Sequence, residues 1–318
     1  MSRRGVLAGS LGTVGAALGL AGLAGCADDG LPGAADEPPP DDATPIPGSD
    51  VLTPRRVAYG DDPAQYADLY RPAPGTTVDG RADGPASKGV VVVIHGGFWR
   101  AEYDATLGAP LALGLAEAGW TAWNLEYRRV GSGEGGGGGF PATLDDVAAG
   151  IDALADVDDL TDAERATVLT LGHSAGGHLA VWAAARGRFE RWAPERVAVT
   201  GAVSQAGVLD LTGALDDATA RPNVLALMGG DAAADPESYA QADPTAHLPL
   251  GVPVRCVHGT DDRIVPITQS LRYVERAVAA GDDATLTEVD GDHFVVIDAA
   301  SPAWSATLDL LEGLRPGG

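Results

Sequence analysis

VLTLGHSAGGHLA, residues 168–180, places a serine between an apolar run and a segment typical of a helix. The apolar run at its start is typical of a strand that is buried on both faces of a sheet. Gly172 and Gly176 permit a sharp turn, because side chains at these positions would collide with the neighbouring strand and helix. The turn exposes Ser174 at the N-terminus of the helix, where the backbone N–H of Ala175 points at any oxyanion formed. The segment therefore predicts a nucleophilic serine at the end of a strand.

The alternation of strand-like and helix-like segments continues on both sides of this serine. Strands are expected at 64–71, 89–94, 121–125, 168–171, 197–203, 254–257 and 284–289. Helices are expected at 141–154, 179–185, 268–280 and 303–314. This order predicts a mostly parallel sheet with helices on both faces. In such a sheet the carboxyl ends of the parallel strands share one side, and ligands bind there.

The segment HGGFW, residues 95–99, follows the most hydrophobic of the expected strands, 89–94. Its backbone N–H groups are expected on the same side of the sheet as the serine. They can supply further hydrogen bonds to an oxyanion. The predicted oxyanion hole consists of the N–H groups of Gly97, Phe98 and Ala175.

Two later strand ends supply a carboxylate and an imidazole. The segment HGTDDRIVP, residues 258–266, offers Asp261 and Asp262, and we assign the acid to Asp262. His293 follows the last expected strand. Asp262 can hold one nitrogen of His293 while the other nitrogen takes the proton of Ser174. The sequence therefore predicts a catalytic triad of Ser174, Asp262 and His293.

Taken together, the motifs resemble those of the α/β-hydrolase fold over roughly residues 51–314. HGGFW and GHSAGGHLA are similar to segments of bacterial esterases and of the kynurenine-formamidase-like branch, and HGTDDRIVP is similar in style to prolyl-oligopeptidase-type hydrolases. The resemblance implies Ser174 as nucleophile, Asp262 as acid and His293 as base, in the chain order of that fold. It implies a serine esterase that cleaves short-chain carboxylic esters or activated amides of small molecules through an acyl-enzyme, without a cofactor.

Other functions and chemistries stay open at this point. One is an exopeptidase or aminoacyl-peptide hydrolase of prolyl-oligopeptidase type, although the expected hydrolase core takes up the length that a gating domain would need. Another is a non-catalytic surface binding protein on a hydrolase fold. His95, His173 and His258 lie at three strand ends, but the sequence contains no close pair of metal ligands. We therefore expect hydrogen-bonding roles for these histidines and no metal.

Residues 1–26 have the composition of an export signal. Arg3 and Arg4 precede an apolar run that ends in Leu-Ala-Gly-Cys. A single weak membrane helix is the alternative, but this ending resembles the lipobox of bacterial lipoproteins, which implies lipidation of Cys26 and anchoring at the outer face of the bacterial cytoplasmic membrane. The arginine pair resembles the twin-arginine export motif, and the export route stays open. Residues 27–50 have the composition of a disordered tether.

The remaining chain, 51–318, is expected to form one catalytic domain. It contains an Asp- and Ala-rich insertion at about 207–250, expected to form a small cap of short helices. The glycine-rich segment 131–139 is expected to be a mobile loop and lacks the Lys-Ser/Thr that a phosphate-binding loop carries. Cys256 lies in an expected strand and is predicted to be a core residue.

The charge balance limits the range of partners. The chain carries 21 Lys and Arg against 45 Asp and Glu, a formal net charge of −24. A protein that binds nucleic acid through phosphate contacts needs the opposite sign, so this class is excluded. Two cysteines allow at most one disulfide, so no disulfide framework is expected. The sequence does not indicate an oligomeric state.

Overall fold

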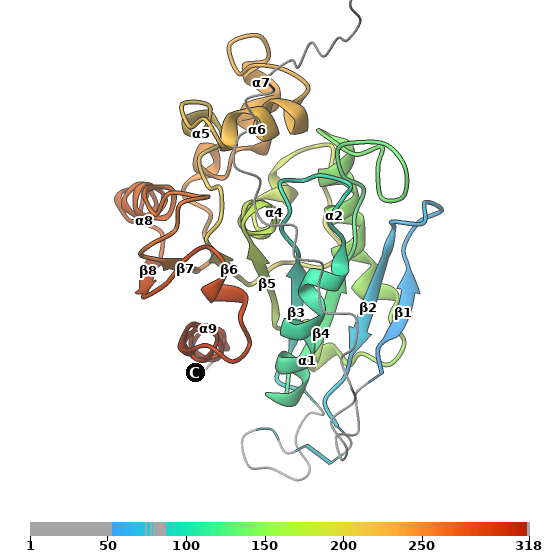
Figure 1. Cartoon of the computed structure of the whole chain (residues 1–318). Coiled ribbons are helices and arrows are strands. Elements are labelled where there is room, and N and C mark those ends of the chain that lie inside the picture. Colours follow the sequence, from blue (N-terminus) through green and yellow to red (C-terminus); the bar gives the residue numbers. More distant parts are fainter. Residues whose placement is uncertain (1–52, 74, 77, 79–86, 317–318) are drawn as a thin grey trace, which may run out of the picture. The chain divides into compact units, whose positions relative to one another are not determined.

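The computed structural model describes residues 53–73, 75–76, 78 and 87–316 (Figure 1). The predicted export signal at 1–26, with Cys26, and all of the predicted tether at 27–50 therefore lie outside the described residues, as do 51 and 52. Asp50–Gly318 form one compact unit.

The centre of this unit is a sheet of eight strands in the order β1-β2-β4-β3-β5-β6-β7-β8. The strands are β1 Arg55–Ala58, β2 Tyr66–Tyr70, β3 Val90–Ile94, β4 Thr121–Leu125, β5 Val168–His173, β6 Gly201–Gln205, β7 Val254–Gly259 and β8 Ala284–Val289. The pairs β1–β2 and β2–β4 are antiparallel, and every other neighbouring pair is parallel. The mostly parallel sheet predicted from the sequence is thus confirmed.

Helices cover both faces of this sheet, as the valine-rich strands require. In β3, Val90 and Val92 join one apolar cluster and Val91 joins another, so neither face can be left in water. The longer helices are α1 Ala109–Glu117, α2 Ala142–Asp152, α4 Ala175–Ala183, α8 Thr268–Ala280 and α9 Pro302–Gly313. Helices α1 and α9 pack on the Val91 face, and α2 and α4 pack on the Val90 face. Helix α8 packs with α4 over β6 and β7.

The insertion after β6 forms short helices, as expected for 207–250. They are α5 Leu211–Ala214, α6 Ala220–Met228 and α7 Pro236–Ala242, which lie together in Figure 1. Their apolar residues, among them Val224 and Leu227, pack into the cluster that contains α2 and α4. The insertion is therefore joined to the core rather than standing apart from it.

The structure differs from the sequence-based expectation at four elements. β1 and α1 were not expected, and the four-residue helix α3, Asp162–Arg165, is also additional. β6 begins at Gly201 rather than at residue 197, because the backbone groups of Val197 make hydrogen bonds with side chains instead of a neighbouring strand. Its N–H donates to Asp152, and its carbonyl accepts from Arg186.

The glycine-rich segment 131–139, expected to be a mobile loop, makes backbone hydrogen bonds with the segment before it. The N–H of Arg129 donates to the carbonyl of Gly135, and the N–H of Gly138 donates to the carbonyl of Arg129, both at 2.7 Å. Gly133 and Gly135 have positive φ angles, which glycine adopts without strain. The glycines therefore permit the tight turns of this loop, and its mobility stays a prediction.

No helix among the described residues combines the length and the apolar character needed to cross a membrane.

Candidate active site

Ser174 occupies the sharp turn between β5 and α4. Its backbone has φ 55° and ψ −119°, a strained combination for a residue with a side chain. A Cβ at Gly172 would lie 2.1 Å from the Gly176 carbonyl oxygen, and a Cβ at Gly176 would lie 2.0 Å from the Ile94 carbonyl oxygen. Only glycine fits at both positions, because any side chain there collides with the neighbouring backbone, as the sequence predicts. The N–H of Ser174 donates to the carbonyl of Gln205 at 2.8 Å and ties the turn to β6.

His293 and Asp262 are joined by a short hydrogen bond. His293 Nδ1 lies 2.6 Å from Asp262 Oδ2, and Asp262 Oδ1 accepts from the N–H groups of Ile264 and Val265, each at 2.9 Å. Burial by itself raises the pKa of the Asp262 carboxyl, but hydrogen bonds from His258 and His293 outweigh it and hold that pKa well below its usual range. Asp262 is therefore a carboxylate that fixes the His293 ring with Nδ1 protonated.

A second histidine supports the same carboxylate. His258 Nε2 lies 2.8 Å from the Val265 carbonyl oxygen and 3.2 Å from Asp262 Oδ2. His258 Nδ1 accepts from the Ser270 hydroxyl at 2.8 Å. This histidine therefore has the hydrogen-bonding role that the sequence predicts for it, and it contacts the Asp262 carboxylate.

His173 connects the serine turn to the loop that carries His293. Its Nε2–H donates to the His293 carbonyl at 2.9 Å, and the centres of the two rings are 4.5 Å apart. Burial, and then the charge of His293, lower the pKa of His173 to about 3. His173 therefore stays neutral at ordinary pH. The residue next to Ser174 is in this way held directly against the candidate base.

Ser174 is only 4% exposed, so the expectation that the turn exposes it is wrong, because the loop after β3 covers the turn. Its hydroxyl makes no hydrogen bond with the described residues. The structure thus brings Asp262 and His293 into contact and places the serine turn beside them without a closed serine–histidine bond. In enzymes without substrate such bonds are often long and tighten when the substrate binds.

The loop after β3 passes directly over the serine. A Cβ at Gly96 would lie 3.2 Å from the Cβ of Ser174. Gly97 and Phe98 have φ angles of 104° and 56°, so both lie in the left-handed region. Within the part of the chain that the structure describes, the N–H groups of Gly97, Phe98 and Ala175 donate to no acceptor. They are three free donors close to the serine, at the positions predicted for the oxyanion hole.

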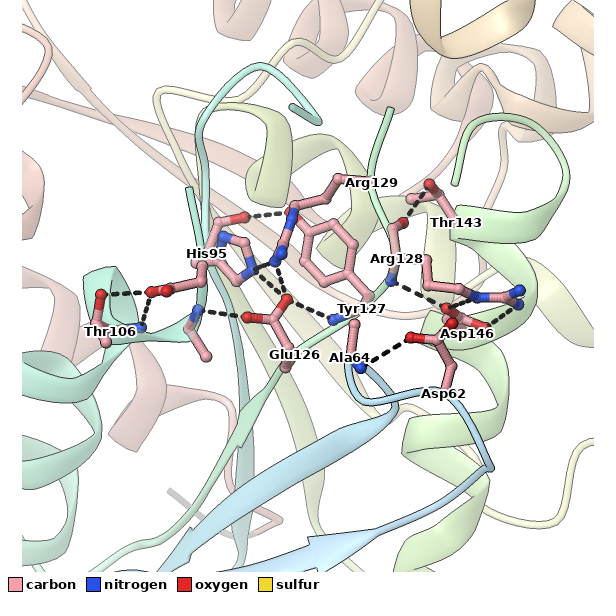
Figure 2. Close-up of polar contacts among 12 residues, drawn as sticks. Asp62, Ala64, His95, Thr106, Glu126, Tyr127, Arg128, Arg129, Thr143 and Asp146 are labelled. Carbon is pink, nitrogen blue, oxygen red and sulfur yellow. Dashed lines mark hydrogen bonds and ion pairs between the residues drawn. The ribbon is translucent and has the colours of Figure 1, made fainter. Parts of the chain in front are cut away.

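A buried charged cluster borders this loop, and sequence reasoning missed it. Figure 2 shows Glu126 and Arg129 beside His95, on the segment that follows β4. Each of the three residues is only 2% exposed. Arg128, which directly precedes Arg129, pairs with Asp146 through two hydrogen bonds of 2.7 and 2.8 Å. The only sequence signal is the run of charged residues directly after an apolar strand.

One of the clefts contains a candidate catalytic residue. It has a volume of about 480 Å³ and is lined by Asp261, Arg263, Ile264, Asp292, His293 and Phe294. A larger cavity of about 630 Å³ lies between α5, α7 and α8 and contains none of the candidate catalytic residues. The smaller cleft thus gives the candidate base access from the surface, and Ser174 is not among its lining residues.

The described residues contain no group of three or more His, Cys, Asp or Glu side chains that could hold a metal ion. Cys256 is buried in β7, and burial raises the pKa of its thiol to about 12. A protonated, buried thiol is a core group rather than a second nucleophile.

The chain is similar to one protein family and to several proteins that are named esterases. The model of the BD-FAE family matches residues 81–276. Esterase LipC of Mycobacterium tuberculosis (strain ATCC 25618 / H37Rv) is 28% identical over 274 residues, which cover 83% of this chain and 62% of that protein. The isoprenylcysteine alpha-carbonyl methylesterase ICME of Arabidopsis thaliana is 25% identical over 257 residues, which cover 74% of this chain and 55% of that protein. The chain thus spans less than two thirds of the length of these relatives.

Solved structures confirm the fold. A truncated carbohydrate esterase from gut microbiota has a TM-score of 0.66 at 20% identity, with 84% of this chain and 98% of that chain covered. Esterase B from Lactobacillus rhamnosis (HN001) has a TM-score of 0.69 at 18% identity, with 83% and 85% covered. Bacterial heroin esterase has a TM-score of 0.63 at 21% identity, with 84% of each chain covered. The predicted α/β-hydrolase fold is therefore confirmed, while the likeness to kynurenine formamidases remains a prediction.

Proposed function

Because the chain belongs to the BD-FAE family, we propose that it is a serine hydrolase that cleaves carboxylic esters, or activated amides, of small molecules. The observation that carries the proposal is the 2.6 Å contact between His293 Nδ1 and the Asp262 carboxylate, beside a serine on a strained strand-to-helix turn. A buried carboxylate–imidazole pair beside a serine hydroxyl is the arrangement that makes serine a nucleophile.

In the proposed mechanism Ser174 Oγ attacks the carbonyl carbon of the ester, and its proton passes to His293 Nε2. The carbonyl oxygen becomes an oxyanion that accepts hydrogen bonds from the oxyanion-hole donors, the N–H groups of Gly97, Phe98 and Ala175. When the tetrahedral intermediate collapses, the bond to the alcohol oxygen breaks and His293 donates the proton to that oxygen. Water then repeats the sequence on the acyl-serine and releases the acid.

The charges around His293 favour this proton transfer. The depressed pKa of Asp262 keeps a negative charge beside the imidazolium that forms on His293. The lowered pKa of His173 keeps that neighbouring ring neutral, so it adds no positive charge against the imidazolium. Both effects stabilise the protonated base in the transition state.

We propose a preference for short acyl groups. A lipase that takes long acyl chains needs an apolar surface to receive them, which is usually a lid. Among the described residues the large exposed hydrophobic side chains are Tyr103, Leu107, Leu271, Val278 and Phe294, and none belongs to the 207–250 insertion. The proposed substrates are therefore esters of small acyl groups, such as acetyl or formyl, on an aryl or sugar-like alcohol.

The test is a series of p-nitrophenyl esters from acetate to dodecanoate with the purified mature domain. We expect kcat/KM to be highest for acetate to butyrate and to fall steadily with chain length, with background hydrolysis measured on the Ser174→Ala protein. A maximum at the long chains contradicts the proposed substrate size. Efficient cleavage of unactivated dipeptides contradicts the ester assignment and favours a peptidase.

We further propose that the protein is exported and anchored by a lipid on Cys26. The support is the Leu-Ala-Gly-Cys ending of residues 1–26, which is a sequence argument alone.

A further inference from the structure

Three charged or ionisable groups are buried together immediately behind the oxyanion loop. The side chains of Glu126, Arg129 and His95 are at most 3% exposed. Removing ions from water costs several kcal/mol for each ion unless hydrogen bonds compensate. An apolar set of the same volume would be cheaper, so the cluster calls for a role other than packing.

The Glu126 carboxylate is the centre of the cluster (Figure 2). Its Oε1 accepts from the N–H of Tyr127 at 2.8 Å and from the Arg129 guanidinium, and lies 3.2 Å from His95 Nε2. Its Oε2 accepts from the N–H of Ala105 at 2.8 Å. One carboxylate thus connects the end of β4, the turn before α1 and the first residue of the oxyanion loop.

His95 connects the Glu126 carboxylate to the backbone of the oxyanion loop. Its Nδ1 lies 2.9 Å from the carbonyl oxygen of Gly96, and because a carbonyl only accepts, Nδ1 carries the hydrogen. The opposite nitrogen, Nε2, has a partner in either protonation state: Glu126 accepts from it when it is protonated, and Arg129 Nη1, at 3.4 Å, donates to it when it is not. The ring is therefore held at both ends.

The Gly96 carbonyl and the Gly97 N–H belong to one planar trans peptide, so they point in opposite directions. When His95 holds the carbonyl, the Gly97 N–H is aimed the other way, where it has no acceptor among the described residues. The preceding peptide is fixed as well, because the Tyr127 hydroxyl donates to the His95 carbonyl at 2.7 Å and the two rings stack at 4.5 Å. Two successive peptides of the loop are thus set by the segment after β4.

We infer that Glu126 is a positioning residue for the oxyanion hole, acting through His95 on the Gly96–Gly97 peptide. The inference rests on the proposed function, in which the Gly97 N–H binds the oxyanion. Glu126 does not touch the substrate in this scheme. It fixes the direction of a donor that is needed only when negative charge develops on the carbonyl oxygen.

The glycine-rich loop closes over this cluster. A Cβ at Gly135 would lie 1.7 Å from Arg129 Nη2, whereas a Cβ at Gly133 would meet nothing within 4 Å, although both residues have positive φ angles. Arg129 Nε is buried without a hydrogen-bond partner among the described residues, so the guanidinium is held by Glu126 and by this close cover. Gly135 is therefore the one residue of this loop that we connect to the cluster, as a close cover for the Arg129 guanidinium.

Such a role has a specific kinetic signature. A donor that acts on the oxyanion stabilises the transition state and not the bound ester, so its loss lowers kcat and leaves KM unchanged. A reversible inhibitor that forms a tetrahedral oxyanion with the serine, such as a trifluoromethyl ketone, loses affinity by the same factor. A purely structural role lowers thermal stability without this pattern.

The experiment compares Glu126→Gln with Glu134→Gln, an exposed glutamate on the glycine-rich loop. Measured on folded protein, Glu126→Gln is expected to lower kcat by about 10²-fold, with KM little changed. The Ki of the trifluoromethyl ketone should rise by the factor by which kcat/KM falls. Glu134→Gln should match the wild type in all three quantities. A folded Glu126→Gln protein with wild-type kcat, or with an unchanged Ki, overturns the inference.

A second pair of variants covers the case in which Glu126→Gln fails to fold. The amide nitrogen of asparagine lies close to the Nδ1 position of a histidine, and that of glutamine lies close to the Nε2 position. His95→Asn keeps a donor for the Gly96 carbonyl but has no atom to face Glu126, whereas His95→Gln can face Glu126 but has no donor for the Gly96 carbonyl. The inference needs both contacts, so each folded variant should lower kcat by about 10²-fold with KM little changed. Wild-type kcat in either folded variant overturns the inference. A wild-type protein with neither esterase turnover nor inhibitor binding refutes the proposed function itself, which is a different result.

Discussion

Asp261 and Asp262 are neighbours in the sequence but have different surroundings. The Asp262 side chain is fully buried and contacts His293 and His258, while Asp261 is exposed and lines the cleft. The choice between them comes from the motif HGTDDRIVP, and the geometry places Asp262 against the imidazole.

Asp262→Asn should therefore cost far more activity than Asp261→Asn. The amide oxygen is held by the two backbone N–H groups that Oδ1 accepts from now, so the amide nitrogen faces His293 Nδ1 and donates to it. This reverses the tautomer and removes the negative charge, so we expect kcat to fall by about 10³-fold or more, against a few-fold change for Asp261→Asn. Steady-state kinetics with p-nitrophenyl acetate measures both. If Asp261→Asn is the more damaging change, the acid is assigned to the wrong residue.

His178 gives the stability of the fold a pH dependence. Its Nε2–H donates to the Ala242 carbonyl at 2.8 Å, and burial lowers the pKa of the ring from 6.5 to about 4. Below pH 6.5 the unfolded chain takes up a proton that the folded chain does not bind until about pH 4. The free energy of unfolding should therefore decrease as the pH falls from 6.5 to 4 and not as it rises. His173, with its lowered pKa, acts in the same direction.

Urea unfolding at pH 7 and at pH 4.5 measures this effect. We expect the wild type to lose stability by at most about 3 kcal/mol per buried histidine over that range. His178→Gln keeps a donor near the Nε2 position and cannot titrate, so its loss should be smaller. An equal loss in both proteins would show that His178 does not stay neutral in the folded chain.

At the scale of elements, the junction between β5 and α4 depends on glycine for space. Gly176→Ala places a methyl group 2.0 Å from the Ile94 carbonyl oxygen, so β3 and α4 must separate. We expect a loss of about 2 kcal/mol of stability together with reduced activity. Gly313→Ala is the matched control, since it also lies in a helix and its Cβ would meet nothing within 4 Å. Thermal unfolding that leaves Gly176→Ala as stable as Gly313→Ala contradicts the packing argument.

Several elements could be predicted because their signals are local. The unbroken valine run of β3 and the spacing of apolar residues in α2 appear within single short windows. β1 could not be predicted, because Arg55–Ala58 is mostly exposed and shows no apolar pattern. α1 is apolar through most of its length, so it lacks the polar face that indicates a helix.

The site residues also divide into those with a local sequence signal and those without one. Ser174, Asp262 and His293 each follow an apolar strand within a short motif, so their chemistry could be predicted from the sequence. The role of Glu126 depends on His95, 31 residues earlier, and on a glycine of a later loop. No window of sequence contains these partners together, and the cluster emerges only from the packing of β3 beside β4.

At the scale of the whole molecule, the proposed lipid anchor concerns the N-terminal region. Cys26 lies outside the described residues, and its assignment as a lipid anchor is a proposal. Cys26→Ser should prevent acylation and move the protein from the membrane fraction to the soluble fraction. Fractionation of salt-washed membranes measures this, with the wild type as reference. Retention of a signal-cleaved, unacylated variant in the membrane would show that another contact anchors the protein.

The central claim is that Ser174 is the nucleophile, and covalent labelling tests it most directly. The wild-type protein is treated with a fluorophosphonate, its esterase activity is followed, and the modified residue is located by peptide mass spectrometry. The account predicts one adduct per chain on Ser174, loss of activity in proportion to labelling, and no labelling of a normally folded Ser174→Ala protein whose kcat is lower by about 10³-fold or more. An adduct on another residue, or near-wild-type turnover by Ser174→Ala, would contradict it.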